Sequence, residues 1–256
     1  MKREGTIKGY LRYNDLNETD KKLLFPETEW IEKERYLLHK SSQQTKEWFK
    51  ARRGIPSKSE EVVIPRLTAS VFSKALNRST YFSTEDEVIK SLLYGLEPER
   101  TPYIKKIMAD GASNESKARE WYEKKTGTKV TEVGLCVPKW NLHLGASVDG
   151  VVADGIIEIK CPPVMFLGIV EYEQEVAKGM KMDEMYYKHI IPDYYDQMQG
   201  SMAILNVKWC DYIVYSITED RYFLYRVLFN PVYWKQLHTD LKKFIVKLNA
   251  QYYIDK

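Results

Sequence analysis

Several features that are common in other proteins are scarce in this 256-residue chain, and each scarcity excludes a class of protein. The three cysteines, Cys136, Cys161 and Cys210, are odd in number and widely separated. They therefore predict neither a disulfide framework nor a clustered zinc or iron–sulfur site. No apolar run approaches the roughly 18 residues of a membrane span, and the first residues lead into no signal-like segment. We accordingly expect a soluble, intracellular protein without a membrane partner.

Three familiar catalytic motifs are also missing. The four histidines lie far apart, and no pair has the spacing of a zinc-binding helix, which argues against a zinc hydrolase or a histidine nuclease. No glycine-rich loop precedes a Lys-Ser or Lys-Thr pair, so we do not expect the chain to use ATP. Ser70 stands in Thr-Ala-Ser rather than in a Gly-x-Ser-x-Gly turn and is therefore a poor candidate for a nucleophile.

Positive charge is concentrated rather than abundant. The formal net charge is only +3, yet the segment from Lys40 to Lys58 holds six basic residues and one acidic residue. Trp48 and Phe49 are interleaved with them. Basic side chains neutralise phosphates, and exposed aromatic rings stack on a base or wedge open a duplex end. The segment therefore suits nucleic-acid binding, although a solvated basic surface helix has the same composition.

The most specific chemical signal is a pattern of charged residues near the middle of the chain. Asp149 stands nine residues before Glu158, which is followed by one apolar residue and Lys160. The run from Gly155 to Lys160 follows Asp154 and contains three β-branched isoleucines, which predicts a short buried strand returning from a hairpin. Side chains alternate along a strand, so Glu158 and Lys160 should point the same way.

This pattern fits a metal-dependent nuclease. A carboxylate and an ammonium on an apolar strand are unfavourable to bury unless they pair or meet a metal. If Asp149 closes the preceding strand, its carboxylate can meet Glu158 across the hairpin, and two oxygen ligands suit Mg²⁺ or Mn²⁺. Such a metal polarises water and neutralises phosphate charge, while Lys160 can orient that water or help to deprotonate it. The alternative from these residues alone is a surface hairpin with solvated charges.

The surrounding sequence resembles the PD-(D/E)XK nuclease superfamily, and within it the lambda exonuclease-like, YqaJ-type recombination exonucleases of phages and large DNA viruses. Five blocks between residues 44 and 205 carry the resemblance in the expected order. They are Glu47 to Gly54, Leu67 to Ser70, Gly111 to Glu115 with Thr126-Gly127, Ser147 to Gly150 with Glu158 to Pro162, and Tyr194 to Gln199. One block would be weak evidence, whereas five in order make a strong match.

The resemblance implies a metal site. Asp149 and Glu158 match the family's metal-binding carboxylates, and the main-chain carbonyl of Ile159 is expected as a further ligand. Lys160 matches the catalytic lysine. The cofactor that this resemblance implies is Mg²⁺, as one ion or two, with Mn²⁺ as a substitute.

The resemblance also assigns residues around that site. Glu115 matches an acidic residue on a helix that supports the metal, through water, and Gln197 matches a glutamine that lines the catalytic site. Arg52 and Ser70 match residues that hold the terminal 5′-phosphate of the substrate. The other expected DNA contacts are Lys50, Arg53 and Trp48.

The chain departs from the family pattern at two places. Val148 replaces the usual proline before the first aspartate, which is a mild change. The segment from Ile55 to Arg66 is an insertion where the family usually has a tight turn, and we expect a loop there. The insertion separates Arg52 from Ser70, so it bears on the phosphate pocket more than on the metal site.

We expect an α/β fold with a PD-(D/E)XK nuclease core, in which helices flank a central mixed β-sheet. Residues 1–43 are expected to form an N-terminal helical extension with a helix at 29–39, and residues 44–256 the nuclease domain. Thr68 is expected to cap the helix that follows it. The remaining predicted helices are 44–53, 83–95, 103–126 with a break near Gly111, 164–179, 193–205 and 232–253. The predicted strands are 130–137, 142–149, 155–160, 209–217 and 221–229.

The function expected from these residues and the resemblance is a Mg²⁺-dependent deoxyribonuclease, a 5′→3′ exonuclease on double-stranded DNA ends in recombination. The resemblance implies a single-strand-annealing protein as partner and a ring-shaped homotrimer as the assembly. We expect the protein to act in the cytoplasm of a bacterial host or, if it comes from a eukaryotic virus, in the nucleus or cytoplasm. One alternative is a viral alkaline nuclease with endonuclease or RNase activity. Another is a nucleic-acid-binding protein without catalysis, which the presence of Asp149, Glu158 and Lys160 disfavours.

Overall fold

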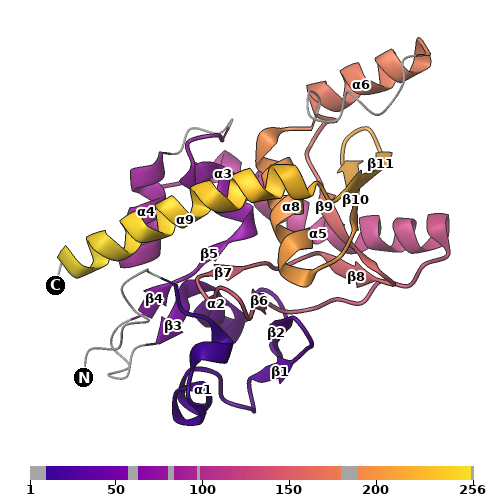
Figure 1. Ribbon diagram of the computed structural model, residues 1–256. Coiled ribbons are helices and arrows are strands. Elements are labelled where there is room, and N and C mark those ends of the chain that lie inside the picture. The colour runs from indigo at the N-terminus through magenta and orange to yellow at the C-terminus, as the bar shows by residue number, and fades with distance from the viewer. Residues whose placement is uncertain (1–9, 57–62, 80–83, 97–98, 180–189, 255–256) are drawn as a thin grey trace.

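A mixed four-stranded sheet forms the centre of the molecule, and helices cover it (Figure 1). The computed structural model describes residues 10–56, 63–79, 84–96, 99–179 and 190–254. The strands are β8 (Gly150–Val152), β9 (Gly155–Lys160), β10 (Trp209–Ser216) and β11 (Arg221–Leu228), in the order β11-β10-β9-β8. β9 and β10 run parallel, whereas the other two neighbouring pairs are antiparallel. The predicted α/β class with a mixed sheet is thus confirmed.

The side-chain alternation along β9 decides what each face of the sheet carries. Ile157 and Ile159 pack against helix α5 in one apolar cluster, and Ile156 packs on the other face with helix α8. The bounds of the two helices are Pro102–Thr126 for α5 and Pro192–Leu205 for α8. Glu158 and Lys160 have the parity of Ile156, so they face α8. The sheet therefore directs these two charged residues toward the helix that carries the predicted glutamine.

The two flanking helices begin and end as their sequences predict. Thr101 caps α5 through a hydrogen bond to its third residue, and the helix ends at Gly127, whose φ of 69° is a conformation that favours glycine. The predicted break near Gly111 is wrong, because α5 is continuous through that residue. Helix α8 begins with Pro192, which suits the first turn, and ends at Asn206 in the left-handed region.

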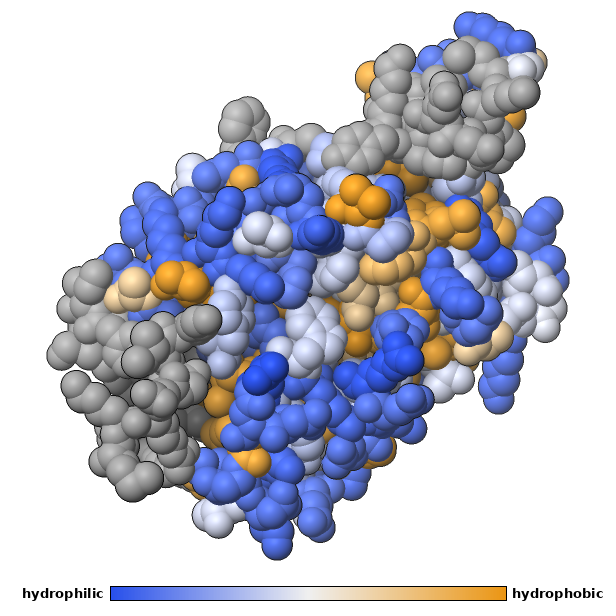
Figure 2. Space-filling model, viewed as in Figure 1, coloured by the Kyte–Doolittle hydropathy of each residue, from blue (hydrophilic) through white to orange (hydrophobic). Residues whose placement is uncertain are grey.

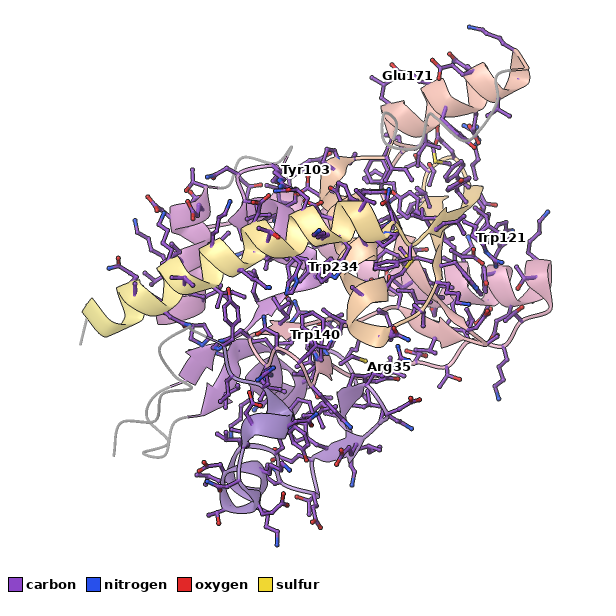
Figure 3. All side chains as sticks on the ribbon, in the orientation of Figure 1. Arg35, Tyr103, Trp121, Trp140, Glu171 and Trp234 are labelled. Carbon is purple, nitrogen blue, oxygen red and sulfur yellow. The ribbon has the colours of Figure 1, made fainter. Side chains whose placement is uncertain are left out.

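A third layer supports α8 from behind. It consists of the 3₁₀ turn η3 (Ala69–Val71) with the helices α3 (Phe72–Ala75), α4 (Glu85–Tyr94) and α9 (Pro231–Ile254). A Cβ atom on Gly200 of α8 would lie 2.4 Å from the Phe72 ring, so glycine allows the two elements to pack closely. Trp234 of α9 meets Trp140 edge to face, with ring centroids 6.3 Å apart (Figure 3). The first contact packs α3 against α8, and the second joins α9 to the turn after β6.

The N-terminal segment differs from the expected helical extension. It contains the 3₁₀ turn η2 (Tyr13–Asp15), the helix α1 (Glu18–Leu24) and the strands β1 (Trp30–Glu32) and β2 (Tyr36–His39). The predicted helix at 29–39 is wrong, because alternate residues, Leu37 and His39, are buried and β2 pairs with β6 (Cys136–Pro138). Period-two burial requires a strand. The division of the chain at residue 43 stays a prediction.

Other predicted elements are confirmed with shorter bounds or replaced. Helix α2 (Lys46–Arg53) ends before Gly54 as expected. The predicted loop at 55–66 is wrong at its ends, since β3 (Gly54–Pro56) and β4 (Val63–Pro65) pair antiparallel, while residues 57–62 lie outside the described residues. Of the predicted strands at 130–137 and 142–149, only β6 and β7 (Leu144–Gly145) form, and β7 pairs with β5 (Leu67–Thr68).

Helix α6 (Leu167–Ala177) lies at one end of the molecule (Figure 1), where it buries Ile169 and Tyr172, and the Tyr172 ring meets Phe223 of β11 edge to face with ring centroids 5.7 Å apart. The face in Figure 2 is mainly hydrophilic over α9, and apolar residues gather toward the side of β10 and α6. Within the described part of the chain, no helix has both the length and the apolar character needed to cross a membrane. The three cysteines are buried and free, in agreement with the predicted lack of a disulfide framework.

Candidate metal and end-binding site

Asp149 and Glu158 face each other across the β8–β9 hairpin. Gly150 pairs with Ile157, which places the preceding Asp149 opposite Glu158. Asp149 directly precedes β8 and lies in no strand, so the expectation that it closes the preceding strand is wrong. Its Oδ2 accepts the Ile159 N–H at 2.6 Å, which fixes the carboxylate against the edge of β9. The hairpin thus brings together the two predicted carboxylates.

Glu158 lies at the centre of a cluster of polar side chains and is almost inaccessible to solvent. Its side chain accepts hydrogen bonds at Oε1 from Lys160 Nζ and from Gln197 Nε2, the latter at 2.6 Å. Gln197 Oε1 in turn accepts from Lys160 at 3.4 Å. Glu158 is 1% exposed, yet its Oε2 has no hydrogen-bond partner among the described residues. A buried carboxylate oxygen without a partner is unfavourable, which indicates a place for a cation.

Burial and mutual repulsion raise the pKa values of these carboxyl groups. Burial raises the pKa of Glu158 to about 7, and the charge of Asp149 adds to this shift against the opposing effect of Lys160. Burial also raises the pKa of Asp149, and it raises the pKa of Glu115 to about 7, where Asp149 contributes further. Burial opposes the Lys160 ammonium, but Glu158 and Asp149 outweigh it and raise the pKa of Lys160. Deprotonation therefore leaves negative charge that a metal ion would relieve.

Helix α5 contributes two residues from the other side of Asp149. Glu115 is close enough for Asp149 and Lys160 to affect its pKa. Among the described residues, no three His, Cys, Asp or Glu side chains form a ready metal cluster, and a contact of Glu115 to the metal through water stays a prediction. Arg119, one turn later, donates from Nε to the Asp149 carbonyl at 3.3 Å and pairs with Glu132 at 2.8 Å. Sequence reasoning missed the contact of Arg119, although it shares a helix face with Glu115.

The predicted phosphate residues also come together, on the far side of Trp48. Arg52 Nη2 donates to the hydroxyls of Thr68 at 3.2 Å and Ser70 at 3.3 Å, and its guanidinium lies 4.4 Å from the Trp48 ring centroid. The predicted capping by Thr68 is wrong, because its side chain makes no hydrogen bond to the turn that follows. Its hydroxyl contacts Arg52 and Ser70 instead. The insertion does not separate the pair, because β3 and β4 return the chain beside α2.

Trp48 itself has a different position from the one expected. Its side chain is 3% exposed, so little of the ring is open for stacking on a nucleic-acid base, and the direct DNA contact of Trp48 stays a prediction. Its Nε1 instead donates to Ser147 Oγ at 3.1 Å. Phe49 is the exposed aromatic residue of this helix, at 50%, and the basic residues Lys50 and Arg53 beside it are also exposed.

The donor set is suited to a hard cation. Asp149 and Glu158 offer oxygen ligands only, and the neighbouring thiol of Cys161 is kept protonated because burial raises its pKa to about 12. Oxygen ligands without thiolate or imidazole favour Mg²⁺ or Mn²⁺ over zinc. The unpartnered Oε2 of Glu158 therefore fits such an ion, and the Ile159 carbonyl as a ligand stays a prediction.

Comparison with known proteins places this site in context. The family described as the YqaJ-like viral recombinase domain matches residues 47–208, a range that holds every residue discussed above for the carboxylate site and for the Arg52–Ser70 pair. A search of curated proteins found no match.

Solved structures of exonucleases resemble this one. The alkaline exonuclease LHK-Exo from Laribacter hongkongensis matches with 29% identity and a TM-score of 0.59, over 82% of this chain and 95% of that one. LHK-Exo in complex with dAMP matches with 28% identity and a TM-score of 0.60 over the same shares. A phage-related exonuclease from Haemophilus somnus 129PT shares 15% identity, with a TM-score of 0.45, over 73% of this chain and 93% of that one.

Proposed function

The chain belongs to the YqaJ-like viral recombinase domain family and is homologous to exonucleases, and from this premise we propose that it is a Mg²⁺-dependent deoxyribonuclease with a PD-(D/E)XK core. Its proposed substrate is the end of double-stranded DNA, degraded from 5′ to 3′ during recombination. The observation that carries the proposal is the buried, unpartnered Oε2 of Glu158 beside Asp149 and Lys160.

Asp149 and Glu158 are the proposed metal-holding residues. Mg²⁺, or Mn²⁺ in its place, would be bound by these carboxylates and by the Ile159 carbonyl, with Glu115 acting through water. When bound, the ion supplies Lewis-acid polarisation of the phosphoryl group and an acidified water. The Ile159 N–H and Arg119 fix Asp149 through its carboxylate and its carbonyl, so the carboxylate is held in one orientation.

Lys160 and Gln197 are proposed to act beside the metal. Since its pKa is raised by the surrounding carboxylates, Lys160 stays an ammonium and offers positive charge and a hydrogen-bond donor to a phosphate oxygen or a water. Its Nζ lies 4.8 Å from the Tyr194 ring centroid, which limits its freedom to move. Gln197 bonds both Glu158 and Lys160 and so holds the two charged groups at a fixed separation.

Arg52 and Ser70 are proposed to bind the terminal 5′-phosphate. A planar guanidinium beside two hydroxyls presents several donors to a phosphate, and stacking on Trp48 orients it. The exposed Lys50 and Arg53 would contact the DNA backbone. An annealing-protein partner and a homotrimer stay predictions of the family resemblance.

The proposal is tested with 5′-labelled linear, nicked and covalently closed circular DNA in Mg²⁺, in Ca²⁺ and in EDTA. We expect release of mononucleotides from linear ends in Mg²⁺, inhibition by Ca²⁺, which prefers longer bonds and more ligands, and no cleavage in EDTA. Undiminished cleavage in EDTA would contradict the metal site. Cleavage of closed circles, with equal rates on all three substrates, would replace the exonuclease by an endonuclease.

A further inference from the structure

The chain that carries Asp149 passes through a gap in an antiparallel ladder. Thr131 and Val151 exchange two backbone hydrogen bonds, and so do Cys136 and Ala146. Hydrogen-bonded pairs recur at every second residue of an antiparallel ladder, yet these two pairs are five residues apart. A regular pleat cannot join them, and residues 132–135 and 147–149, all of them described, form no strand. The segment that leads into Asp149 therefore lacks backbone pairing on this side.

The side chain of Gln43 closes this gap. Its Nε2 donates to the Val133 carbonyl at 2.9 Å and to the Val148 carbonyl at 2.8 Å, one on each side of the opening. One amide group thus donates to both chain segments at the point where they make no backbone pair with each other. Val148 directly precedes Asp149, so this bond fixes the peptide next to the carboxylate.

Local packing places Gln43 at that position. Gly134 lets the chain before Gln43 approach closely, because a Cβ atom on it would lie 2.4 Å from the His39 carbonyl oxygen. Gln44 then takes a positive φ of 66°, which turns the chain into helix α2. The helix returns a second contact, the Trp48 Nε1 bond to Ser147. The two residues that precede Asp149 are thus both held: Val148 by Gln43, just before helix α2, and Ser147 by Trp48, within that helix.

We propose that Gln43 and Trp48 are positioning residues, which hold Asp149 in the orientation needed to bind the metal. The inference rests on the proposed function of Asp149 as a metal ligand. Trp48 also stacks on Arg52, so this one side chain contacts both the proposed phosphate-binding arginine and the segment that leads to the metal site. Residues that orient a ligand typically change metal affinity by about 10- to 100-fold when they are removed.

The experiment measures Mn²⁺ binding by electron paramagnetic resonance in the absence of DNA. Gln43→Leu removes both donors, Ser147→Ala removes the partner of Trp48, and Asp149→Asn is the reference for loss of the ligand itself. We expect binding to weaken about tenfold or more in Gln43→Leu, and less in Ser147→Ala. The exposed neighbour supplies a matched control, since Gln44→Asn tolerates the positive φ and should bind Mn²⁺ like the wild type.

Thermal unfolding in EDTA separates positioning from folding. A residue that only stabilises the fold would lower the melting temperature and leave the Mn²⁺ affinity of the folded protein unchanged, and that result in Gln43→Leu would overturn the inference. If this variant does not fold, Gln43→Met and Ser147→Ala decide by the same criterion. Wild-type protein that binds no Mn²⁺, or Asp149→Asn that binds it unchanged, would instead overturn the proposed function.

Discussion

The carboxylate site on β8 and β9 and the arginine pocket beside α2 share Trp48 as a neighbour but differ in burial and in chain connection. Asp149 and Glu158 meet within one hairpin, and Glu158 is 1% exposed. Arg52 and Ser70 come from two segments joined by the β3–β4 hairpin, and Ser70 is exposed.

The difference separates two kinds of chemistry. In the carboxylate site, low solvent access raises the pKa values of Glu158 and Glu115 to about 7, so charge there depends strongly on pH and on a bound cation. The arginine pocket is more open, since Ser70 is exposed and Arg52 is half-buried, and it offers hydrogen-bond donors rather than oxygen ligands. Changes in the first region should therefore act on turnover and metal binding, whereas changes in the second should act on the choice of DNA end.

The largest expected effect is the loss of turnover on removing a carboxylate-site residue. Asp149→Ala, Glu158→Ala and Lys160→Ala should each lower kcat on the order of 10³-fold or more, since each group acts on the same reacting centre. DNA affinity in Ca²⁺, measured by fluorescence anisotropy, should change little. Near wild-type turnover of Lys160→Ala in Mg²⁺ would contradict its assigned role and leave only the two carboxylates in the site.

The next effect is a pH dependence confined to the carboxylate site. Metal binding must displace protons from groups whose pKa is near 7, so Mn²⁺ affinity should rise with pH up to mildly alkaline values, by about tenfold per unit for each proton displaced. Calorimetric titrations of Mn²⁺ at pH 6, 7 and 8 measure this slope. Glu115→Gln should reduce the slope, and a flat profile would show that the carboxyl groups are already ionised at pH 6.

A third effect appears in stability without metal. A carboxyl group whose pKa is raised in the folded state stabilises the fold below its unfolded pKa and loses that contribution as pH rises through about 7. In EDTA at pH 8, Glu158→Gln should therefore raise the free energy of unfolding by roughly 1–3 kcal/mol. Urea unfolding at pH 4 and pH 8 measures the difference, which should nearly vanish at pH 4, below the unfolded pKa. A Glu158→Gln variant that is less stable than the wild type at pH 8 would mean that the ion pair of Glu158 with Lys160 outweighs the cost of burying the carboxylate.

The smallest effect belongs to the arginine pocket. Arg52→Lys keeps the charge but loses the planar donors, so it should lower the preference for a 5′-phosphate over a 5′-hydroxyl end by about tenfold. Initial rates on the two linear substrates measure that preference. Arg53→Lys, on the same helix, is the matched control and should leave the ratio unchanged. An equal loss of preference in both variants would assign the effect to general backbone contact.

The sequence predicted the parts of the molecule that depend on local rules. The β9 strand, the end of α2 before Gly54 and the end of α5 at Gly127 follow from apolar alternation and capping residues. The meeting of Asp149 with Glu158 follows from the short hairpin between them. Each of these features is decided by residues within a few positions along the chain.

Contacts between distant residues decided the rest. The segment at 29–39 becomes strands because β6, about a hundred positions later, offers a pairing edge, and such a partner cannot be read from local periodicity. Trp48 looks like an exposed stacking ring in the sequence but is buried in an apolar cluster with distant residues such as Leu37 and Leu135. No local sequence pattern identifies Gln43, because its role depends on a gap in the backbone pairing between two other segments of the chain. Sequence therefore determined which groups the site contains, and tertiary packing decided how firmly they are held, because burial and long-range hydrogen bonds depend on the whole fold.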